Sequence, residues 1–164
     1  MKKKFNKSNG TPFFVNFLRI WLAFVAIMAF GNTFHCFMNS TYLYDRLYTV
    51  SERNVSGLAA RLFGIWTLLS GIVRLLCGLF IYNRTLYIIT LLSFVLALGH
   101  FTSEVFIYNT ASLTTAGIIA PLIVSSLSIT LMILGYYFMD EEDPRDKYVD
   151  ENEELLKTKG KKPL

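Results

Sequence analysis

Ionisable side chains that could do chemistry lie inside long apolar stretches of this sequence. The residues are Arg61, Arg74, His100 and Glu104. His100 and Glu104 are four residues apart, so on a helix their side chains would share one face. A histidine beside a carboxylate can transfer protons, and an arginine can stabilise a negatively charged group. The same groups could instead form ion pairs that fix the register between helices.

Antiparallel helices would bring several of these groups to one depth. The chain turns near residue 83, so Glu104 should lie level with Arg61, and we predict an ion pair between them. Arg74 should lie deeper, where it could extend to the membrane surface or bind a lipid phosphate or a partner's carboxylate. A polar cluster is expected, serving either helix register or proton transfer and substrate binding. The predicted cluster consists of Arg61, His100, Glu104, Asn32 and His35.

The elements that position these residues are predicted to be membrane helices. Hydrophobic residues make up 53% of the chain and charged residues only 17%. A bilayer is crossed by about 20 apolar residues in a helix, and several stretches exceed that length. We therefore predict an all-α membrane protein with four transmembrane helices and a tight hairpin between the second and third. The predicted parts are a basic N-terminus at 1–13, a membrane domain at 14–139 with helices at about 14–37, 57–82, 85–108 and 115–139, and a charged tail at 140–164.

Lys and Arg are distributed unevenly on the two sides of this membrane domain. Four lysines precede the first helix, Arg84 lies in the second loop and six basic residues lie in the tail, against two in the first loop. The positive-inside rule then places both termini in the cytosol. Lys161 and Lys162, the fourth and third residues from the end, are typical of a retrieval signal for the endoplasmic reticulum, unless they are a chance basic end. Asn39 and Asn54 fit the glycosylation sequon on the opposite side, where unmodified chance matches are the alternative.

Glycine recurs every seven residues along the second predicted helix. This spacing keeps small residues on one side of the helix, where another helix can approach closely. The partner could be a helix of the same chain or of another protein, and self-association through this seam is one of the alternatives. The seam consists of Gly57, Gly64, Gly71 and Gly78.

Other patterns exclude several classes of function. Cys36 and Cys77 lie in apolar segments without metal-ligand spacing, so we expect both in the core. The sequence has no nucleotide-binding loop, zinc motif or nucleophile motif, so we predict no catalytic residue, no cofactor and no metal. Its basic residues are concentrated outside the apolar stretches, which favours contact with the membrane surface and argues against nucleic acid.

Two motifs resemble those of the ergosterol biosynthetic protein 28 family. They are Ala-Arg-Leu-Phe-Gly-Ile-Trp-Thr at 60–67 and His-Phe-Thr-Ser-Glu at 100–104. Leu62 departs from the pattern, because the family is expected to have threonine there. The resemblance covers about residues 14–139. Shorter matches lie at 18–22, 31–33 and 120–122.

The resemblance implies a non-enzymatic scaffold of the endoplasmic reticulum. Such proteins tether the enzymes that remove the C-4 methyl groups of sterols. These partners are the sterol C-4 methyl oxidase, the decarboxylating C-3 sterol dehydrogenase and the 3-keto sterol reductase. The alternative is a small four-span lipid enzyme, similar to a sterol isomerase or a membrane glutathione transferase. Arg61, His100 and Glu104 would then have acid–base or thiolate-stabilising roles.

Overall fold

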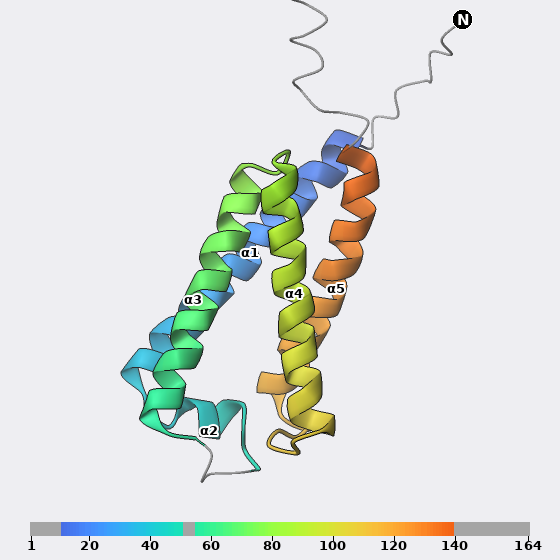
Figure 1. Cartoon of the computed structure of the whole chain (residues 1–164). Coiled ribbons are helices and arrows are strands. Elements are labelled where there is room, and N and C mark those ends of the chain that lie inside the picture. The colour runs from blue at the N-terminus through green and yellow to red at the C-terminus, as the bar shows by residue number, and fades with distance from the viewer. Residues whose placement is uncertain (1–10, 51–54, 140–164) are drawn as a thin grey trace, which may run out of the picture.

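Residues 11–50 and 55–139 are described by the computed structural model, and they form helices without any strand (Figure 1). Four of the helices are long and apolar enough to cross a membrane. The prediction of an all-α membrane protein with four transmembrane helices is therefore confirmed. Lys161, Lys162 and Asn54 lie outside the described residues. The helices are α1 (Thr11–Met38), α2 (Tyr42–Arg46), α3 (Gly57–Leu79), α4 (Arg84–Phe106) and α5 (Ala116–Met139).

The four long helices form two pairs. The most extensive contacts join α1 to α3 and α4 to α5. Figure 1 shows the start of α1 beside the end of α5, at what we call the terminal end of the bundle. The short helix α2 and the α4–α5 connection lie at the opposite end, which we call the loop end. The two pairs therefore face each other across the interior of the protein.

Three of the four glycines spaced every seven residues on α3 lie against α1, whereas Gly57 faces Ser40 beyond the end of α1. A Cβ at Gly64 would lie 3.0 Å from the ring of Phe37, and a Cβ at Gly71 would lie 2.7 Å from the ring of Phe30. In a membrane, such close approach is a main source of helix pairing, because lipid removes the hydrophobic effect between helices. The structure places the last three glycines of this seam inside the protein, between α1 and α3. The series is Gly57, Gly64, Gly71 and Gly78.

The predicted hairpin of the second and third long helices has a short turn but few other contacts. The Asn83 side chain begins α4 by accepting a hydrogen bond from the amide of Leu86 at 3.1 Å. Figure 1 shows α3 and α4 close together at this turn and diverging toward the loop end. Each packs more extensively on another helix than on its hairpin neighbour. The candidate site lies between the two helix pairs.

Hydrogen bonds join helices both between the two pairs and within one of them. Trp21 of α1 donates its indole N–H to the Ser128 hydroxyl of α5 at 2.9 Å. Tyr87 of α4 donates its hydroxyl to a backbone carbonyl of α5 at 2.5 Å. Cys36 and Cys77 are buried free thiols, as expected for core residues.

Candidate functional site

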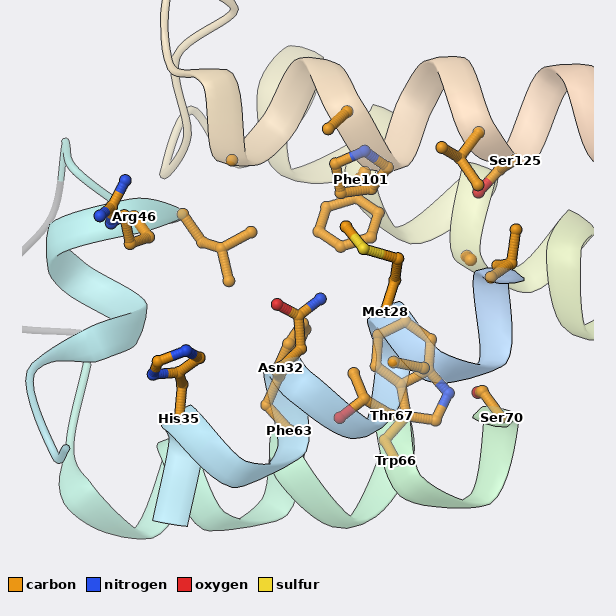
Figure 2. A pocket seen from close by; sticks show the side chains of 18 of the residues that line it. Met28, Asn32, His35, Arg46, Phe63, Trp66, Thr67, Ser70, Phe101 and Ser125 are labelled. Atoms are coloured by element: carbon orange, nitrogen blue, oxygen red, sulfur yellow. The ribbon is translucent and has the colours of Figure 1, made fainter. Parts of the chain in front are cut away.

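A cavity of about 770 Å³ separates the α1–α3 pair from the α4–α5 pair. All five helices contribute to its lining, which is mainly apolar and aromatic. Figure 2 shows Ser70 of α3 and Ser125 of α5 at one end of the cavity, and His35 and Arg46 at the other. We call these the serine end and the mouth. Cavities of this size with a few polar groups are typical of small-molecule sites.

A buried arginine lines the cavity beyond the serine end. Arg74 follows Ser70 by one turn of α3, and only 9% of its side chain is exposed. Its guanidinium carbon lies 4.2 Å from the centre of the Phe94 ring, a cation–π contact. The Nε atom is buried without a hydrogen-bond partner. Arg74 is therefore buried in the bundle and does not extend to the membrane surface, which was one of the alternatives that the sequence left open.

Asn32 and His35 of the predicted polar cluster lie near the mouth. Tyr42 of α2 donates its hydroxyl to Oδ1 of Asn32 at 2.9 Å. The ring of His35 stacks on the ring of Tyr42, with centres 5.1 Å apart. Burial raises the pKa of Tyr42, so its hydroxyl remains a hydrogen-bond donor at neutral pH. These contacts attach α2 to α1 beside the cavity.

His100 and Glu104 of the predicted polar cluster form a separate group on α4. Nδ1 of His100 lies 3.9 Å from Oε1 of Glu104, and the hydroxyl of Thr110 donates to the same carboxylate. Nε2 of His100 lies 2.7 Å from the hydroxyl of Tyr48. Burial and the nearby Glu104 raise the pKa of Tyr48, so its phenol stays protonated at neutral pH, and the tautomer of His100 decides which of the two groups donates. The contact between Tyr48 and His100 therefore connects the loop before α3 to α4.

The predicted ion pair between Arg61 and Glu104 is not formed. Arg61 is exposed, and Glu104 is engaged by His100 and Thr110 instead. The physical reason is lateral separation: the two residues lie at similar depth, but their helices diverge toward the loop end (Figure 1). The single predicted cluster is therefore two groups, with Arg61 in neither.

Sequence reasoning missed several residues of the site. Tyr42 and Tyr48 come from the connection between α1 and α3, and no spacing in the sequence indicates that they bind residues on α1 and α4. Ser70 carried a usable signal, because it is a hydroxyl one helical turn from an arginine inside an apolar stretch. Trp66 lies one further turn away on the same helix and lines the same cavity.

Comparisons with known proteins connect this architecture to one family. The family model described as Erg28 like protein matches residues 18–130. The ergosterol biosynthetic protein 28 homolog of Homo sapiens is 53% identical over 129 residues, which cover 79% of this chain and 91% of the human protein. Ergosterol biosynthetic protein 28 of Candida albicans is 37% identical over 117 residues, covering 71% of this chain and 83% of that protein. No solved structure matches the chain. The chain therefore belongs to the Erg28 family.

Proposed function

We propose that this chain acts in sterol biosynthesis as a non-enzymatic membrane scaffold. Its proposed partners are the sterol C-4 methyl oxidase, the decarboxylating C-3 sterol dehydrogenase and the 3-keto sterol reductase. The observation that carries the proposal is family membership across the membrane domain, since the relatives are named for ergosterol biosynthesis. Large apolar side chains on the outward faces of the long helices supply surface on which other membrane helices can pack.

Crosslinking in microsomes tests this proposal. Purification of the tagged full-length chain is expected to recover all three enzymes, whereas an unrelated four-span protein with the same tag should recover none. Removal of the chain should raise the level of 4-methylated sterols, while each enzyme retains its intrinsic activity in isolation. Recovery of none of the three enzymes would contradict the scaffold.

One observation favours a sterol-modifying enzyme as the second candidate function. A further cavity, of about 590 Å³, is lined by Tyr48, His100 and Glu104. A histidine held between a phenol and a carboxylate could transfer protons. Incubating the purified chain alone with sterol intermediates separates the two functions. Product formation that is lost in His100→Phe would establish the enzyme and reject the scaffold.

We further propose that the protein resides in the endoplasmic reticulum with both termini in the cytosol. The excess of Lys and Arg on the side of the termini supports this orientation, as does the position of the α1 start and α5 end at one end of the bundle. A tag on the tail should be removed by protease from intact microsomes. Replacing Lys161 and Lys162 by Ser should let part of the protein leave the endoplasmic reticulum. A protected tag would overturn the orientation, and an unchanged location would overturn the retrieval role.

A further inference from the structure

Arg74 is a buried cation for which the described part of the chain supplies no anion. Arginine keeps its proton in proteins, so its charge persists inside the membrane domain and requires compensation. Among the described residues none forms an ion pair with Arg74, and the Phe94 ring covers only one face of the guanidinium. Asp45 lines the same cavity, but it belongs to α2 at the mouth and accepts a hydrogen bond from Thr41. The described residues therefore leave a position beside Arg74 for an anion, and we assign it to a ligand.

Two hydroxyl groups accompany this cation. Ser70 and Ser125 are buried, and neither makes a hydrogen bond to another described residue. Figure 2 shows both at the same end of the cavity, on opposite walls, and Arg74 follows Ser70 by one turn. A guanidinium fork with two hydroxyl donors matches a carboxylate, which accepts several hydrogen bonds at once.

The rest of the cavity fits an apolar body. Its volume of about 770 Å³ lies within the range of sites for single drug-sized ligands. Phe63, Trp66 and Phe101 line the wall between the serine end and the mouth (Figure 2). Such a lining accommodates one compact molecule, whereas a phospholipid with two acyl chains is much larger than a drug-sized ligand.

We propose that this cavity binds one sterol-sized lipid that carries a carboxylate, with the carboxylate on Arg74, Ser70 and Ser125. The ring body lies along the aromatic wall. The choice of a sterol as the body rests on the proposed function, whereas the carboxylate follows from the buried cation. An enzyme that oxidises a methyl group to a carboxylate must supply such a ligand, and a decarboxylating enzyme must consume it. The scaffold would then hold the carboxylate-bearing sterol as well as the enzymes that produce and consume it.

Binding to the isolated full-length chain tests this inference without the enzymes. The chain is placed in phosphatidylcholine nanodiscs, and cholesteryl hemisuccinate is titrated while the combined fluorescence of Trp21 and Trp66 is followed. Cholesterol, oleate and phosphatidic acid are titrated in parallel. Cholesteryl hemisuccinate is expected to bind at least about tenfold more tightly than each of the other three, since it alone combines a sterol body with a carboxylate.

Variants of α3 identify the anion site. Arg74→Met should lower the affinity for cholesteryl hemisuccinate about tenfold or more and leave cholesterol unaffected. Arg74→Lys should retain part of the affinity, because it keeps the charge but loses the planar fork. Arg61→Met is the matched control, since Arg61 is an exposed cation on the same helix, and it should change neither affinity.

Three results would overturn the inference. They are equal affinity for cholesterol and cholesteryl hemisuccinate, equal or tighter binding of oleate or phosphatidic acid, and unchanged affinity in Arg74→Met. If Arg74→Met does not fold, Ala120→Phe replaces it, because it adds a ring to the cavity lining on α5. Unchanged affinity in that variant would equally reject the site. Failure of the crosslinking experiment with intact binding would instead reject the scaffold and keep the lipid site.

Discussion

Gly71→Leu is expected to separate α1 from α3 and to remove most of the folded protein from the membrane. Even a methyl group at this position would lie 2.7 Å from the ring of Phe30 and 3.3 Å from Ala29. Overpacking a well-packed interface by a few methylene groups typically costs about 1–3 kcal/mol. The destabilisation by Gly71→Leu should lie at the upper end of this range, because the α1–α3 interface is the most extensive among the described helices.

Gly99→Leu provides the matched control for this prediction. Gly99 lies on α4, and a Cβ there would have no atom within 4 Å. Both variants add the same apolar side chain, so their insertion into the membrane should be favoured equally. The measurement is the abundance of each variant in membranes and the thermal unfolding midpoint of the purified protein in detergent. Equal midpoints for the two variants would show that the glycine seam does not hold α1 and α3 together.

The sequence was sufficient to predict the helices because the membrane constrains them strongly. Backbone groups in lipid must be paired within each segment, so long apolar stretches become helices. Local caps set several boundaries: the Ser56 hydroxyl accepts from the amide of Ala59 at 3.2 Å, and Asn83 begins α4. The fourth helix was predicted from residue 115 and begins at Ala116. Pro121 is tolerated one turn later, because a membrane helix can leave one backbone carbonyl to other partners.

The candidate site could be predicted only in part, because depth in a membrane does not determine lateral distance. Depth matching placed Arg61 and Glu104 at one level, but the divergence of α3 and α4 keeps them apart (Figure 1). The bond between Tyr48 and His100 joins residues 52 positions apart and depends on how a loop docks. Helical spacing was reliable within one helix, where it placed His100 next to Glu104.

The inward orientation of Arg74 also depends on tertiary structure. Helical spacing alone could not say whether this side chain extends along the membrane or points into the bundle. The rotation of α3 is fixed by its glycine side, because Gly71 and Gly78 must face α1. The packing of α3 on α1 therefore determines which polar residues of α3 can reach a ligand. The glycine seam in this way orients Arg74 toward the proposed lipid site.

Gly117→Val is expected to displace α2 from the mouth of the cavity. A Cβ at Gly117 would overlap the backbone carbonyl oxygen of Arg46 in α2, so even a small side chain forces the two elements apart. Displacement of α2 should expose Cys36, which is buried in a cluster with Leu43 and Leu47. The measurement is the rate at which N-ethylmaleimide modifies Cys36.

This rate should rise roughly tenfold or more, since overpacking costs about 1–3 kcal/mol and each 1.4 kcal/mol is a factor of ten. Cys77 is an internal control, because it lies in the other buried cluster and should remain unmodified. Gly31→Val is the matched variant, since a Cβ at Gly31 meets no atom within 4 Å. If Gly117→Val and Gly31→Val expose Cys36 equally, the contact between α2 and α5 does not hold α2 over Cys36. If Cys36 alone becomes reactive in Gly117→Val, that contact is what keeps α2 packed over Cys36 at the loop end.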